Sequence, residues 1–151
     1  MGAQFSVNTG KITLTASATK SLILLDPVTN QFVLTEISVS LDASAAAAGV
    51  QIDLYRTNTL GTPAGTTAVL NKLDPNSQAA TTTGLTALTT EPTSIFILDS
   101  WYLQPLGGLI VVQYPLGREP LAAAAGARLG LQYATPASVT PDCVATVWFE
   151  E

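Results

Sequence analysis

The sequence predicts an all-β fold, an antiparallel sandwich or barrel with about eight or more short strands and long loops. Apolar residues recur at every second position in several short segments, as they do in strands that bury one face. Clusters of Gly, Pro, Asn and Asp separate these segments and are typical of turns between strands. No segment shows the period of an amphipathic helix.

The segment Val33–Leu41 shows the alternation most clearly. Val33, Ile37, Val39 and Leu41 share one face, and Glu36, Ser38 and Ser40 lie on the other. This pattern predicts an antiparallel strand that is half buried. The same alternation predicts four further strands: Lys11–Thr15, Val50–Arg56, Arg128–Tyr133 and Val144–Phe149.

Three other segments are apolar without interruption, namely Ser21–Leu25, Ile95–Leu98 and Leu109–Val112. Runs of this length are typical of strands that are covered on both faces. We therefore expect all three in the interior of the fold.

The length of 151 residues fits one domain, and we expect residues 1–7 to form an extended N-terminal arm. Residues 71–93 are the longest weakly patterned stretch. They are interpreted as a surface crossing between two sheets, which is compatible with a loop that contacts a partner.

Composition excludes several classes of function. Only 11% of the residues are charged, against about 25% in typical soluble proteins, while Ala and Thr occur 21 times each. The chain has no His, so no His-based catalytic triad or imidazole metal site is available. Its net charge of −5 argues against binding to nucleic acid.

We also expect no cofactor, no metal and no membrane association. The apolar runs are much shorter than the ~20 residues of a membrane span, and no secretory signal is expected at residues 1–6. The single cysteine, Cys143, has no Lys, Arg or His near it in sequence. It is interpreted as a small buried apolar residue and not as a reactive thiol.

Paired carboxylates are the only enzyme chemistry that the composition leaves open. The candidates are Asp53, Asp99 and Glu119, each in or beside a predicted strand. Strict alternation places Asp53 opposite Ile52 and Leu54, toward solvent, and places Asp99 on the inward face. Because single acids at strand ends are usually solvated, we expect no enzymatic activity.

Large aromatic side chains offer a second possibility. An exposed aromatic platform can bind carbohydrate, although aromatic residues in a β-sandwich usually belong to the core. The candidates are Trp101, Tyr102, Tyr114, Tyr133 and Trp148.

The segment Gln113–Pro120 (QYPLGREP) follows an apolar strand and contains two prolines and one glycine. Pro115 ends the strand, and Gly117 permits a left-handed turn. Arg118 then projects from a stiffened loop, either to pair locally or, with Glu119, to anchor a contact between subunits.

The stretch Trp101–Pro120 resembles small virion proteins of tailed bacteriophages, as do the segments VQIDLYRT at residues 50–57 and ATVWFE at residues 145–150. The resemblance implies a jelly-roll β-sandwich that attaches to the outside of the capsid as a decoration protein, often as a trimer. It implies no cofactor and no catalytic residue.

We therefore expect a structural virion protein, made in the host cytoplasm, whose partners are its own copies in a homotrimer and the major capsid protein. Expected interface residues are Tyr114, Arg118, Glu119 and Trp101. The alternative is a sugar- or receptor-binding module of a phage tail or head fibre.

Overall fold

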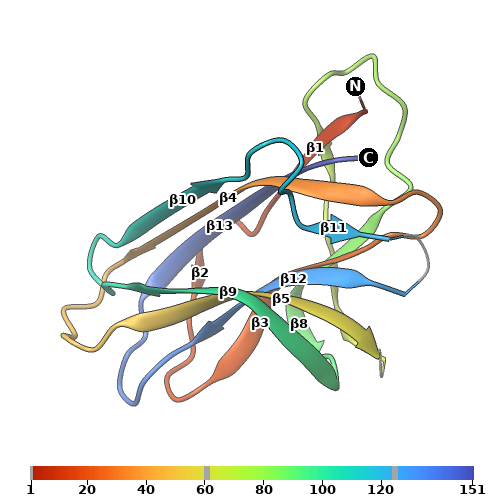
Figure 1. Ribbon diagram of the computed structural model, residues 1–151. Helices are drawn as coiled ribbons and strands as arrows, with labels where there is room; N and C mark the ends of the chain where they lie inside the picture. The colour runs from red at the N-terminus through yellow and green to blue at the C-terminus, as the bar shows by residue number, and fades with distance from the viewer. Residues whose placement is uncertain (1, 60–61, 124–125) are drawn as a thin grey trace.

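The computed structural model describes residues 2–59, 62–123 and 126–151. They form two antiparallel sheets packed face to face (Figure 1), with thirteen strands and no helix among the described residues. No segment of this part of the chain is a helix long and apolar enough to span a membrane. The strands are β1 Gln4–Asn8, β2 Ile12–Thr13, β3 Thr19–Asp26, β4 Phe32–Asp42, β5 Val50–Thr59, β6 Ala64–Thr67, β7 Asn71–Lys72, β8 Thr83–Thr90, β9 Ser94–Leu103, β10 Leu109–Gln113, β11 Leu121–Ala122, β12 Arg128–Ala134 and β13 Asp142–Glu150.

The strand order is that of a jelly roll. One sheet has seven strands, with β10-β4-β13-β1-β7 as its main path, and the other has six, in the order β6-β8-β3-β12-β5-β9. Eight of these strands form a long hairpin rolled over on itself: β1 pairs with β13, β3 with β12, β4 with β10 and β5 with β9. The pairs β4–β13 and β5–β12 then complete the two sheets. Both the predicted β-sandwich and its jelly-roll form are confirmed.

Alternation in the sequence corresponds to burial in the structure. In β13, every second residue from Cys143 to Phe149 is buried. β4 alternates in the same way from Ile37 to Leu41, but an irregularity at Thr35 and Glu36 places Leu34 in the core and not Val33, for which the predicted face was wrong. The main core lies between the sheets, where the rings of Phe5, Phe32 and Phe149 pack together.

Of the three continuous apolar runs, only Ser21–Leu25 is buried as predicted. It lies in β3, which has a neighbouring strand on each side. The prediction was wrong for Ile95–Leu98 and Leu109–Val112. These runs belong to β9 and β10, which are edge strands, and their side chains are largely exposed or only partly covered.

The segment between β5 and β9 crosses from one sheet to the other, as predicted for residues 71–93. Its strand β7 pairs with β1, and its strand β8 pairs with β3. The crossing therefore extends both sheets at the same side of the sandwich.

The N-terminal segment differs from the extended arm expected over residues 1–7. Residues 4–8 form β1 between β13 and β7, and Phe5 and Val7 are buried in the core. The two apolar side chains explain why the segment joins the sheet. Met1 lies outside the described residues.

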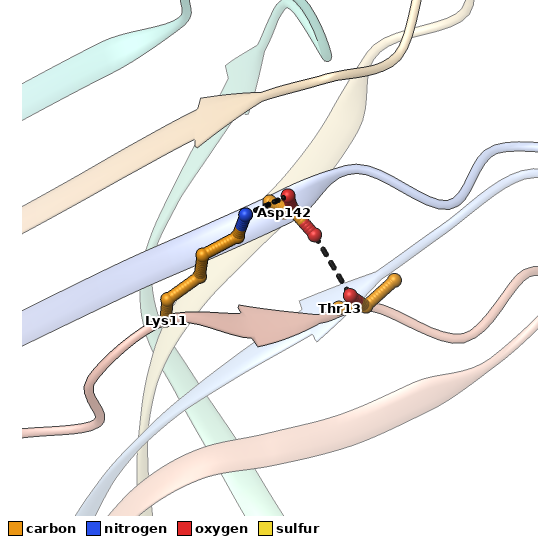
Figure 2. A network of polar contacts seen from close by, with 3 residues as sticks. All are labelled: Lys11, Thr13 and Asp142. Atoms are coloured by element: carbon orange, nitrogen blue, oxygen red, sulfur yellow. Dashed lines mark hydrogen bonds and ion pairs between the residues drawn. The ribbon is translucent and has the colours of Figure 1, made fainter.

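A short strand, β2, is held against β13 by polar contacts (Figure 2). Lys11 Nζ lies 2.8 Å from Asp142 Oδ2, and Thr13 Oγ1 donates a hydrogen bond of 2.7 Å to Asp142 Oδ1. Of the predicted strand Lys11–Thr15, only Ile12 and Thr13 pair with β13. The hydrogen bond from Lys11, followed by that from Thr13, lowers the pKa of the Asp142 carboxyl.

Candidate interaction surface

The sandwich ends in edge strands on both sides, the short β6 and β7 on one and the longer β9 and β10 on the other. We call the latter the open side and define it as β9, β10, β11 and the connections between them, residues 94–122. In Figure 1, β10 lies in the upper layer and β9 in the lower layer, at the end of each sheet. The opposite side is extended by β7 and β8 of the crossing segment. The open side therefore has free backbone N–H and C=O groups, which can pair with another chain.

Exposed apolar side chains are concentrated on the open side. Of the twelve large apolar residues exposed within the described part of the chain, nine lie between residues 96 and 121. They are Phe96, Ile97, Leu98, Tyr102, Leu106, Leu109, Val111, Leu116 and Leu121. The nine side chains come from both sheets, since Tyr102 lies in β9 and Leu109 and Val111 lie in β10.

The loop of the QYPLGREP segment has the conformation expected from its sequence. The N–H of Arg118 donates to Pro115 O at 2.9 Å, and Gly117 has a φ of 82°. Glu119 Oε2 accepts a hydrogen bond of 2.6 Å from the N–H of Gly117. These contacts hold the turn in one shape.

Two of the predicted interface residues, Arg118 and Glu119, therefore lie together on the open side. The Arg118 side chain is exposed and forms no ion pair among the described residues, so the local pairing considered for it is not observed. Glu119 is partly buried and supports the turn. Leu116, at the tip of this turn, is 95% exposed and was missed by the sequence analysis. An apolar residue between Pro and Gly in a surface turn is the signal that could have identified it.

The other two predicted interface residues, Trp101 and Tyr114, lie at the inner margin of the open side. Both are partly buried and pack against the main core. The Tyr114 hydroxyl is buried and has no hydrogen-bond partner in the described part of the chain. Burial, followed by the charge of Asp99, raises the pKa of Tyr114 to about 12. These residues support the surface from within and are not its most exposed part.

Arg56 connects the two sheets at this margin. It lies in β5 of the six-stranded sheet, and its Nη2 donates a hydrogen bond of 2.7 Å to the backbone oxygen of Leu121 in β11. The contact fixes β11, and with it the end of the QYPLGREP loop, against the other sheet.

The candidate carboxylates are not brought together by the fold. Asp53 lies on the outer face of its sheet as predicted, but it is buried and not exposed to solvent. Its Oδ1 accepts hydrogen bonds from Gln51 Nε2 at 2.8 Å and Ser100 Oγ at 2.6 Å, and its Oδ2 accepts one from Gln132 Nε2 at 3.0 Å. These neighbouring side chains cover the carboxylate.

Asp99 lies on the inward face as predicted, but it is exposed there, and it does not share that face with Ile97. The register of β9 shifts at Leu98, so that Asp99 pairs with Leu54 whereas Ile97 pairs with Tyr55. Asp99 therefore lies on the same face as the core residue Leu54 and on the opposite face from Ile97, and it is exposed at the margin of the sheet. Because Asp53 and Asp99 lie on opposite faces, they cannot flank one bond as the acids of a glycosidase do.

The remaining candidates have separate environments. Tyr133 is buried in the main core, Tyr102 is 76% exposed beside Gln51, and Trp148 is partly buried on the outer face of the seven-stranded sheet. Cys143 is buried as predicted, and burial raises its pKa to about 12. Among the described residues, no group of three or more His, Cys, Asp or Glu could hold a metal ion.

Comparisons with known proteins give little information about this chain. No protein-family model matches it, and no curated protein matches it. A solved structure, that of the VP2 subviral particle of infectious bursal disease virus, is 13% identical over 99% of this chain and 39% of its own, with a TM-score of 0.15. This chain thus spans about two-fifths of the length of that viral protein. A TM-score at this level does not establish a common fold, and no statement about function rests on it.

Proposed function

We propose that this chain is a structural virion protein that binds the outer surface of an icosahedral phage capsid as a homotrimer, through its open side. The observation that carries the proposal is the position of the exposed apolar side chains, nine of twelve of which lie within residues 96–121. Exposed apolar side chains that gather in one region, unlike singly scattered ones, are typical of surfaces that contact other proteins. The resemblance of residues 101–120 to phage virion proteins is the reason for proposing the capsid as the partner.

The open side has the composition of a protein interface. Charged residues are depleted at interface cores, whereas aromatic residues, Met and Arg are enriched. Leu109, Val111 and Leu116, in β10 and the turn after it, are exposed aliphatic residues, and Gln113 is the exposed polar residue of β10. Arg118 lies at the border of this area and can form directional hydrogen bonds with a partner carboxylate.

A homotrimer strengthens the binding of each chain to a capsid. Once one subunit is bound, the others are held close to equivalent sites, so that weak individual contacts give a strong combined one. This multivalency accounts for a stabilising role that requires no chemical reaction.

The proposal is tested by adding the purified protein to capsids assembled without it. We expect the wild-type protein to cosediment with the capsids and to raise the temperature at which filled capsids release their DNA. A Leu116→Asp variant should bind at least about tenfold more weakly, as expected when an interface hot spot is lost. The measurement is the bound fraction at increasing protein concentration.

Val69→Asp is the matched control, because Val69 is also an exposed aliphatic residue, at 73%, but lies between β6 and β7 in the crossing segment. It should bind as the wild type does. Failure of the wild-type protein to bind any capsid, or equal binding by the Leu116→Asp variant, contradicts the proposal.

The alternative of a sugar- or receptor-binding module with Trp101 as its platform has less support. Trp101 packs against the core between the sheets, so its indole ring does not form an open platform.

A further inference from the structure

A shallow hollow on the outer face of the seven-stranded sheet has a different chemistry from the open side. It has a volume of about 360 Å³. Trp148 and Glu36 lie beside Gln4 in the hollow, Gln113 and Tyr114 line it at the end of β10, and Leu73 of the crossing segment also lines it. The lining therefore combines one indole ring with amide and carboxylate groups.

Strand register places these residues in one row across the sheet. Gln113 of β10 is opposite Glu36 of β4, and Glu36 is opposite Trp148 of β13. The row continues to Ser6 of β1 and Asn71 of β7. Neighbouring strands lie about 4.8 Å apart, so polar side chains flank the indole ring on both sides.

Several polar groups in the hollow have unused hydrogen-bonding capacity. Gln113 Nε2 donates to Glu36 Oε2 at 2.8 Å. This leaves the other carboxylate oxygen and the Gln113 carbonyl as acceptors. Trp148 Nε1 and the amide of the exposed Gln4 are hydrogen-bond donors that line the same hollow. The hollow thus has both donors and acceptors around an apolar ring.

This combination fits a saccharide. A sugar ring has C–H groups on its faces, which pack on aromatic rings, and hydroxyl groups at its edge, which both donate and accept hydrogen bonds. Amide and carboxylate groups beside an aromatic side chain meet these two requirements together.

The charge of the hollow selects among saccharides. Glu36 is the only charged residue among the described residues that line it, and the chain has a net charge of −5. An acidic sugar would be repelled by this carboxylate, whereas a neutral sugar would not.

We propose that this hollow binds neutral oligosaccharides, with Trp148 as the stacking platform and Glu36, Gln113 and Gln4 as hydrogen-bonding groups. The hollow borders the open side, because Gln113 and Tyr114 lie within residues 94–122, but Trp148, Glu36 and Gln4 come from strands outside it. Sugar binding is measured on the free protein, so its result does not depend on the result of the capsid-binding experiment.

Tryptophan fluorescence tests the proposal directly, because the chain has only two tryptophans. In a Trp101→Phe variant, the emission reports on Trp148 alone. Titration with maltohexaose, chitohexaose or mannohexaose should change this emission and reach saturation for at least one of the three. Heparin and polygalacturonate, which are acidic, should not bind in the hollow.

Binding is then measured by calorimetry for three further variants. Trp148→Ala should weaken binding by about tenfold or more, and Gln113→Ala, on an exposed edge strand, should weaken it several-fold without affecting the fold. Tyr102→Ala is the control, because Tyr102 is the most exposed aromatic residue, at 76%, but lies in the other sheet. Its binding should equal that of the wild type.

Three results would overturn the proposal. They are the absence of a saturable response to all three neutral oligosaccharides, binding of the acidic polymers alone, and binding that survives both Trp148→Ala and Gln113→Ala. Circular dichroism establishes that each variant is folded.

Discussion

At the scale of single residues, the Tyr55 ring takes the space that a side chain on Gly130 would need. The two residues are opposite each other in β5 and β12, and a Cβ atom on Gly130 would lie 2.2 Å from Tyr55 Cζ. The Tyr55 ring also packs with Leu24 and Leu88 in a second apolar cluster, separate from the main core. Its hydroxyl is 2.7 Å from Ser21 Oγ, and burial raises its pKa.

The first prediction at this scale is that Gly130→Ala destabilises the protein by about 1 to 3 kcal/mol, the usual cost of overpacking. The Tyr55 ring must move, and it would lose contact with Leu24 and Leu88. Urea unfolding measures the change. Gly49→Ala is the control, since a Cβ there would meet nothing closer than 3.4 Å. Equal stability of the two variants would show that the ring shifts without cost.

Asp53 and Asp99 show how far alternation predicts the position of a single side chain. Alternation correctly predicted the face of Asp53, because β5 is regular at that point. Its burial depends on Ser100 and Gln132, which come from other strands and were not identifiable as neighbours from the sequence. The prediction that Asp99 and Ile97 share one face was wrong because one irregular residue, Leu98, reverses the alternation between them.

At the scale of elements, the carboxylate of Glu151 connects the end of the chain after β13 to the crossing segment. It accepts hydrogen bonds from the N–H groups of Thr81 and Thr82, from the Thr81 hydroxyl and from Asn30 Nδ2. Burial would raise its pKa, but these hydrogen bonds outweigh it and hold the pKa below the ordinary value of 4.5.

A pH dependence follows from this contact. A lowered folded-state pKa stabilises the protein fully above pH 4.5, and the contribution is lost as the pH falls through the folded-state value. We expect Glu151→Gln to reduce stability at pH 7 but to lose less stability than the wild type between pH 5 and pH 3, a range set by this carboxyl group.

Urea unfolding at a series of pH values provides the measurement. The control is Asp42→Asn, because Asp42 is exposed and lies at the opposite end of β4 from Val33, which pairs with Glu150. Identical pH profiles for wild type and Glu151→Gln would contradict the role assigned to this carboxylate.

The apolar runs of β3, β9 and β10 show what determines burial for a whole strand. Their sequences are similar in hydrophobicity, but β3 lies inside its sheet whereas β9 and β10 lie at the ends of theirs. A strand inside a sheet has neighbours on both sides, and an edge strand has one. Position in the sheet depends on pairing with distant segments, which a local pattern does not contain.

At the scale of the whole molecule, the two sides of the sandwich are unequal. The crossing segment extends both sheets at one side through β7 and β8, and the open side has no equivalent extension. Exposed edge strands with apolar side chains favour association with other chains. We therefore expect the purified protein to be a trimer in solution.

Sedimentation equilibrium tests this expectation. Leu109→Asp, on the exposed edge strand β10, should shift the trimer to monomer, because a charge at the centre of an apolar contact must be desolvated without a partner. Val28→Asp, at a site of comparable exposure outside residues 96–121, should leave the trimer intact. A monomeric wild-type protein would refute the expected trimer.

Local information in the sequence was enough to predict the strand-rich sandwich, the burial of Ser21–Leu25 and Cys143, and the turn at Gly117. Alternation, turn residues and side-chain polarity depend on a few neighbouring positions, so they can be recognised from the sequence alone. The open side, the buried state of Asp53 and the hollow around Trp148 became visible only in the folded chain. Each of them depends on residues from different strands, which come together through pairing across the sheet.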